Sequence, residues 1–373
     1  MYSDGGLHHD NAERSSSLLD FFPSQSLPPA PASLFARDAV IDDLLGLMER
    51  FTSIVLFGAG GIGKSATALT LLHHDQVTAR FGENRYFMRC DNLANSLDSF
   101  LGRLSEITGP LRTTDMTQIR SRLTLSPHIL VLDGVDHILD PLAPGAAEIA
   151  AAIEEFSRCQ NVCLVTTSKM DVGIPDFRHI EVPMLPEDGA RHMFHSRCHL
   201  VRSPGVDKLL GELDFHPLSV DLLATAVREN GWDEPTLLNA WDGGNTSILK
   251  VPGRQSLEDN IESILLAPSL RKLGSTARKT LEGIALFPRG VRESSLESMF
   301  PRIAGVREAA DVLCKFSLVY RRDGLVKTLS PFRLYFLESI QSLADIPGRD
   351  PHNPDVDEDI QYISGSSSIP STL

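Results

Sequence analysis

"SIVLFGAGGIGKSATALTLL", residues 53 to 72, begins as a short apolar run, breaks into glycines and a lysine, and then resumes in a helix-like pattern. An apolar run of this length is typical of a buried strand, and alanine and leucine favour a helix. The stretch therefore predicts a strand, a tight glycine-rich loop and a helix in direct succession.

The loop itself, residues 58 to 65, matches GxxxxGK[ST] at every required place. Its glycines let successive backbone N–H groups point into one concavity, where the helix N-terminus adds positive potential. We expect Lys64 to neutralise the β and γ phosphates of a nucleotide and Ser65 to ligate magnesium. The candidate nucleotide-binding residues here are Gly58, Ala59, Gly60, Gly61, Ile62, Gly63, Lys64, Ser65 and Ala66.

Similar apolar runs recur at residues 85 to 90, 128 to 133, 161 to 167 and 179 to 182. Helical patterns alternate with these runs, notably at residues 96 to 108 and 146 to 157. Strands that alternate with helices form parallel sheets with both faces covered. We therefore predict a doubly wound α/β P-loop NTPase domain over residues 34 to 183.

The run "HILVLD" ends in Asp133, whose carboxylate can hold the magnesium ion through water. ATP or ADP with Mg²⁺ is thus the predicted ligand pair, and Ser65 and Asp133 are the predicted metal-site residues. Hydrolysis also needs a group that orients water, and the residue after Asp133 is Gly134. Asp136 is the available substitute, although it is equally a candidate turn residue.

The rest of the chain predicts two further modules between flexible ends. Residues 184 to 250 read as helical, with a break at 243 to 245. Residues 251 to 343 carry helical patterns around 257 to 266, 276 to 286, 292 to 300 and 305 to 316, followed by an Asp323-Gly324 hairpin signal. Helices followed by a hairpin indicate a winged helix. Residues 1 to 33 and 344 to 373 have the composition of disordered segments.

Composition restricts the class of protein. A net charge of −14 and no basic run of five or more argue against nucleic acid and anionic membrane as partners, so the winged helix is expected to pack internally. The chain contains five dispersed cysteines and no stretch of 18 apolar residues. We expect a soluble, cytoplasmic protein.

Seven motifs in order are similar to those of the NB-ARC family of STAND-class ATPases, and within it to fungal NLR-like receptors. They are "FARD", the phosphate loop, "RYFMRCDNL", "ILVLDGVD", "VCLVTTS", "FHPLSVDLLA" and "ALFPRGV", within residues 34 to 341.

This resemblance implies roles for further positions. Thr166 and Thr167 are implied to end the strand that carries the family's sensor motif. Ser168 stands where the family has arginine in that motif. Pro217 is implied to lie against adenine, although its position also suits helix initiation. The segment "SPFRLYF" is similar to the fungal variant with Pro331 and Arg333, in which Arg333 is expected to reach phosphate; the alternative is that Arg333 pairs with an acid on a helix surface.

Two clusters suggest metal binding, and we discount both. His192, His195 and His199 are predicted to lie on the solvated side of one helix, opposite a stripe of Ala190, Met193, Phe194 and Val201. The pair Cys159 and Cys163 lacks a partner pair and is expected to be core thiols.

The expected function is a nucleotide-controlled switch with slow ATP hydrolysis. We expect a homo-oligomer, or association with longer homologues of which this chain resembles a truncated form. An adaptor or decoy that binds nucleotide without hydrolysis is the alternative, favoured by Gly134 and Ser168. A small-molecule kinase is disfavoured, because no arginine-bearing lid follows the nucleotide fold.

Overall fold

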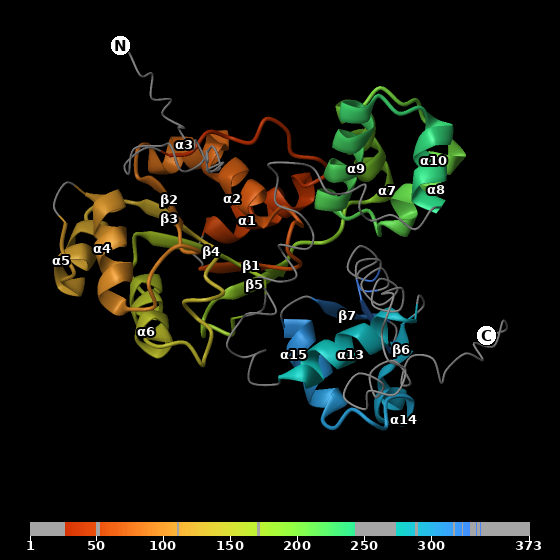
Figure 1. The fold of residues 1–373 in the computed structure, drawn as a ribbon. Coiled ribbons are helices and arrows are strands. Elements are labelled where there is room, and N and C mark those ends of the chain that lie inside the picture. The colour runs from red at the N-terminus through yellow and green to blue at the C-terminus, as the bar shows by residue number, and fades with distance from the viewer. Residues whose placement is uncertain are drawn as a thin grey trace, which may run out of the picture.

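The structure is a computed structural model that describes residues 27–49, 53–109, 112–169, 172–242, 274–287, 290–315, 318–322 and 324–328, together with Arg333 and Phe336. Figure 1 shows its elements in three groups: a sheet with flanking helices, a cluster of helices, and a mixed group of helices and short strands. Residues 1–26 of the predicted leader 1–33 lie outside the described residues, as do the predicted segments 243–245, 257–266 and 344–373.

The first group is built on a five-stranded parallel sheet in the order β2-β3-β4-β1-β5. Its strands coincide with the five apolar runs of the sequence, so these predicted strands are confirmed. Their bounds are β1 (Ile54–Phe57), β2 (Arg85–Arg89), β3 (His128–Asp133), β4 (Val162–Ser168) and β5 (Arg178–Glu181).

Helices cover both faces of this sheet because alternate strand residues point to opposite sides. Ile54 and Leu56 belong to one apolar core, whereas Val55 between them belongs to the other. The first core contains residues of α1 (Asp38–Met48), α2 (Lys64–His73) and α3 (Asp75–Phe81). The second contains residues of α4 (Leu97–Thr108), α5 (Met116–Leu123) and α6 (Ala146–Ser157).

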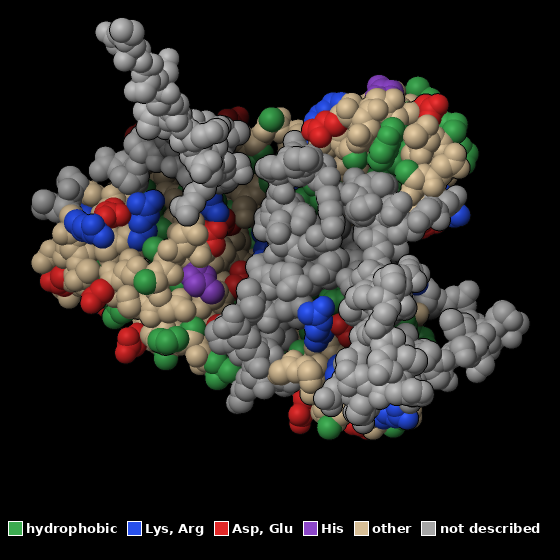
Figure 2. Space-filling model, viewed as in Figure 1, with side chains coloured by type: hydrophobic (Ala, Val, Ile, Leu, Met, Phe, Trp, Pro, Cys, Tyr) green, Lys and Arg blue, Asp and Glu red, His purple; other side chains and the backbone are tan. Residues whose placement is uncertain are grey.

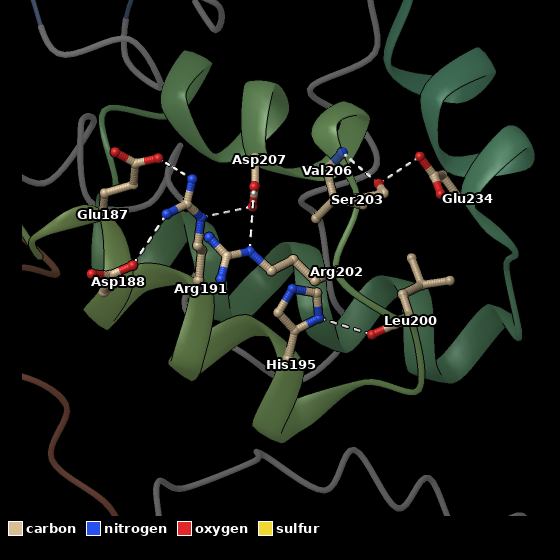
Figure 3. A network of polar contacts seen from close by, with 10 residues as sticks. All are labelled: Glu187, Asp188, Arg191, His195, Leu200, Arg202, Ser203, Val206, Asp207 and Glu234. Atoms are coloured by element: carbon tan, nitrogen blue, oxygen red, sulfur yellow. Dashed lines mark hydrogen bonds and ion pairs between the residues drawn. The ribbon is translucent and has the colours of Figure 1, made fainter.

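The second group consists of helices, as the sequence predicts for this region. They are α7 (Glu187–Arg197), α8 (Pro204–Glu212), α9 (Pro217–Asn230) and α10 (Glu234–Asp242). Arg191 of α7 binds Asp207 of α8 (Nε to Oδ1, 2.8 Å), and Ser203, the N-cap of α8, donates to Glu234 of α10 (2.6 Å). Figure 3 shows this network, which ties the three helices into one unit.

The third group combines helices with an antiparallel sheet in the order β6-β8-β7. Its elements are α13 (Ser275–Ala285), β6 (Val291–Arg292), a 3₁₀ turn (Glu293–Ser295), α14 (Leu296–Met299), α15 (Val306–Lys315), β7 (Val319–Arg322) and β8 (Leu325–Thr328). The predicted hairpin is present as β7 and β8. The predicted helix over 292–300 is wrong at its start, because Val291 and Arg292 pair with β8 and only the last turn is α-helical.

The cysteines, the apolar helices and the surface charges can be compared with the expectations from composition. All five cysteines are free thiols, and Cys159 and Cys163 are buried in the cores, as expected. No described helix is long and apolar enough to cross a membrane. On the face drawn in Figure 2, the basic side chains of the described residues lie among acidic ones rather than in one continuous patch.

Candidate functional site

The glycine-rich loop connects the end of β1 to the start of α2, at the carboxyl edge of the sheet. Gly58, Gly61 and Gly63 have φ angles of +144°, +78° and +101°, which side-chain-bearing residues rarely adopt. Gly63 is the N-cap of α2, and the first N–H groups of a helix have no acceptor within it. The loop therefore presents backbone donors at a helix N-terminus, which is a site for an anion.

Lys64 is buried at the base of this loop. Its Nζ donates to the carbonyl oxygens of Gly58 and Ala59, both at 2.8 Å. Burial lowers the pKa of Lys64 to about 8, with a further lowering by Lys169, while Asp136 and Asp133 act in the opposite direction. A dianionic phosphate beside Nζ would favour the charged form and reverse this shift.

Asp133, Ser65 and Thr167 converge beside the loop from three separate elements. Asp133 Oδ1 accepts hydrogen bonds from Ser65 Oγ (2.7 Å) and Thr167 Oγ1 (2.6 Å). Burial raises the pKa of Asp133, and the two hydroxyl hydrogen bonds and Lys64 oppose the rise. The convergence follows from strand order, because β4 lies between β3 and β1 and their carboxyl ends meet at one edge.

Gly134 and Asp136 follow β3 and are anchored to the end of β4. The Gly134 N–H donates to Thr167 Oγ1 (2.9 Å), and Gly134 itself has a φ of +73°. Asp136 Oδ1 accepts from Ser168 Oγ (2.9 Å) and from the backbone N–H of Lys169. The structure thus brings Asp136 to the predicted region, while one of its oxygens is already engaged in shaping the loop.

Two buried side chains bind backbone carbonyl oxygens of the glycine-rich loop, and sequence reasoning did not single out either for this role. Arg37 Nη2 donates to the carbonyl oxygen of Ile62 (3.0 Å), and His216 Nε2 lies 3.0 Å from the carbonyl oxygen of Gly60. Arg37 belongs to the "FARD" motif and His216 to "FHPL", so the motif order was their only signal. Burial lowers the pKa of both side chains, that of His216 to about 4.

Pro217 occupies the first turn of α9, directly after its N-cap His216. Helix initiation, the simpler of the two predicted roles, is confirmed by this position. Contact between Pro217 and an adenine base stays a prediction.

The predicted arrangement of the histidine cluster is wrong in two places. Helix α7 ends at Arg197, so Val201 lies outside it and is 78% exposed. His195 is half-buried rather than solvated, and its Nδ1 lies 2.8 Å from the carbonyl oxygen of Leu200. The predicted helix, which included residues 190–201, is longer than the helix that forms. Ala190, Met193 and Phe194 are buried, and His192 and His199 are exposed, as expected.

Arg333 carries a buried Nε with no hydrogen-bond partner among the described residues, and burial lowers its pKa. No acid within the described ranges pairs with it, and Pro331 lies outside those ranges. Both expectations for Arg333 stay predictions.

No protein-family model matches the chain, and a comparison with curated proteins finds no match. Among solved structures, the Walker-type ATPase of Pyrococcus abyssi is 15% identical, with 83% of this chain and 98% of that chain covered and a TM-score of 0.59. A STAND protein with a tetratricopeptide repeat sensor from Pyrococcus horikoshii is 14% identical, with 86% and 47% covered and a TM-score of 0.37. The Aeropyrum pernix ORC1 protein in complex with DNA is 14% identical, with 84% and 95% covered and a TM-score of 0.41.

The latter two TM-scores are too low to bear on the fold. The first likeness, together with the parallel sheet and the glycine-rich loop, confirms the predicted α/β P-loop NTPase fold.

Proposed function

We propose that this protein is an ATP- and ADP-binding switch of the STAND type, in which nucleotide exchange and slow hydrolysis control conformation and oligomerisation in signalling. The observation that carries the proposal is that the nucleotide domain and the helical group meet at the glycine-rich loop. There, Lys64, Ser65 and Asp133 supply the groups for a magnesium nucleotide, and His216 from the helical group contacts the same loop. A ligand at this junction touches elements that two conformational states can arrange differently.

The residues present fit a phosphate group and its magnesium ion. The loop offers backbone N–H donors and a buried ammonium, which suit a polyphosphate. Ser65 Oγ and Asp133 Oδ1 are hard oxygen donors 2.7 Å apart, which suit Mg²⁺. Ser65 and Asp133 would hold Mg²⁺, which would supply positive charge beside the phosphates, and Thr167 holds the Asp133 carboxylate in place.

Asp136 is the proposed residue that orients water for hydrolysis. Its carboxylate lies on the loop after β3 and retains one oxygen besides Oδ1, which already accepts two hydrogen bonds. A carboxylate with part of its capacity committed to structure is consistent with slow turnover. The same observation favours the alternative, an adaptor that binds nucleotide without hydrolysing it.

Residues 184–250 and 251–343 are the proposed moving parts, a helical domain and a winged helix. The described part of the latter has helices α13 and α15 packed against β7 and β8, which supports the winged-helix assignment. Homo-oligomerisation, or association with longer homologues, is the proposed output, and size-exclusion chromatography with light scattering in ADP and in a non-hydrolysable ATP analogue tests it.

Nucleotide content and turnover of the purified protein test the core of the proposal. Wild type is compared with Lys64→Ala, Asp136→Ala and the matched surface control Lys208→Ala, whose side chain is 80% exposed. The switch predicts released ADP and slow turnover in wild type and in the control, and no turnover in the other two variants. Bound nucleotide without any turnover supports the adaptor, and absence of nucleotide binding refutes the phosphate-loop assignment.

A further inference from the structure

Helix α9 begins directly against the glycine-rich loop. The carbonyl oxygen of Gly60 lies 3.0 Å from His216 Nε2, 156 positions away in the sequence. A Cβ atom placed on Gly61 would come within 2.6 Å of Leu218 Cβ and 3.1 Å of His216 Cε1. His216 and Leu218 therefore touch the two residues at the tip of the loop.

The hydrogen bonds of His216 determine which ring nitrogen carries the hydrogen. A carbonyl oxygen only accepts, so Nε2 carries the hydrogen that it donates to Gly60. Nδ1 lies 3.4 Å from the backbone N of Ser219 and 3.1 Å from Ser219 Oγ, so it accepts at the N-terminus of α9. The ring is neutral and links the helix start on one side to the loop on the other.

The bond to Gly60 sets the direction of the next N–H group. In a planar trans peptide, the C=O of one residue and the N–H of the following residue point in opposite directions. With the Gly60 oxygen directed toward His216, the Gly61 N–H is directed away from α9. Arg37, bound to the Ile62 oxygen at 3.0 Å, acts in the same way on the Gly63 N–H.

We propose that His216 is a positioning residue of the nucleotide site, which orients the Gly60–Gly61 peptide for phosphate and couples the start of α9 to occupancy of the loop. The inference rests on the proposed function and specifies its regulation. When phosphate accepts the Gly61 N–H, any rotation of that peptide moves the oxygen that His216 holds. The first turn of α9 responds because Nδ1 of the same ring caps it.

The test compares His216→Leu, which keeps side-chain bulk and removes the donor, with His216→Gln, which keeps an N–H donor. Ser219→Ala is the matched control, since it removes a neighbour of Nδ1 and leaves Nε2 intact. For each protein, affinity for Mg-ADP is measured by titration calorimetry. Hydrogen–deuterium exchange of peptides covering 58–66 and 217–223 is recorded with and without Mg-ADP.

In wild type, both segments should gain protection on addition of Mg-ADP. His216→Leu should bind about three- to tenfold more weakly, as expected for one lost hydrogen bond. It should keep nucleotide-dependent protection of 58–66 while losing that of 217–223. His216→Gln and Ser219→Ala should both keep the response of 217–223.

If His216→Leu binds Mg-ADP as tightly as wild type and keeps the nucleotide-dependent protection of 217–223, the inference is overturned and the proposed function still stands. So does a folded His216→Gln variant without the response, or a Ser219→Ala variant as impaired as His216→Leu, which would reduce His216 to a helix cap. Wild type that shows no protection of 58–66 refutes the proposed function and the inference with it.

Discussion

Replacing His216 by leucine should remove a pH-dependent component of folding stability. Burial, and then the positive charges of Lys64 and Arg37, lower the pKa of His216 from 6.5 to about 4, while the hydrogen bond to Gly60 opposes them. In the unfolded chain the His216 imidazole takes up a proton as the pH falls below 6.5, whereas in the folded chain it stays neutral down to about pH 4. The free energy of unfolding therefore falls as pH falls through this window.

The size of the effect follows from the two pKa values. A depression from 6.5 to about 4 removes about 2 kcal/mol of stability between pH 7 and pH 5, and about 3 kcal/mol by pH 4. His216→Leu also loses hydrogen bonds and is expected to be less stable at every pH. The informative quantity is thus the slope of stability with pH, not its absolute value.

Urea unfolding at pH 7.0, 6.0 and 5.0 measures that slope in wild type, His216→Leu and the control His192→Gln, whose histidine is exposed. Wild type and the control should both lose about 2 kcal/mol more than His216→Leu from pH 7 to pH 5. Parallel profiles for wild type and His216→Leu would show that the ring is not held neutral, and would refute the reasoning.

Three other substitutions test the loop and its partners. Gly61→Ala should destabilise the fold by more than Gly63→Ala, because both have positive φ but only Gly61 faces Leu218, and equal losses by thermal unfolding would contradict this. Thr167→Val should cost about 1–3 kcal/mol in urea unfolding by removing the hydroxyl bound to Asp133 and Gly134. Thr166→Val is its control and should cost much less, because the bond that the Thr166 hydroxyl makes within the described part of the chain is a long one, 3.4 Å to the carbonyl oxygen of Ile54. Asp133→Asn should keep the fold and abolish the dependence of nucleotide affinity on Mg²⁺, so unchanged affinities with and without EDTA are expected in that variant alone.

The sequence predicted the three central strands β1, β3 and β4 well because each is a short continuous run whose burial is visible in its own residues. The edge strands β2 and β5 are less buried, so their residues carry a weaker signal. Prediction failed where pairing with a distant segment overrode local preference. Residues 291–292 join β6 because β8 supplies their hydrogen bonds, and helical periodicity in 292–300 cannot reveal that partner. A second failure lies at α7, which ends at Arg197 and leaves Val201 in solvent although Val201 continues the apolar spacing.

The sequence by itself determined the loop, its lysine and the carboxylate at the end of β3, because these groups form motifs in which spacing and chemistry coincide. Only the tertiary structure decided that Thr167 would bind Asp133, and that His216 and Arg37 would bind the carbonyl oxygens of the loop. The physical reason is that His216 and Arg37 bind backbone carbonyl groups. Every residue carries a carbonyl, so such a bond leaves no mark on the identity of its acceptor, and packing alone selects which carbonyl lies within reach.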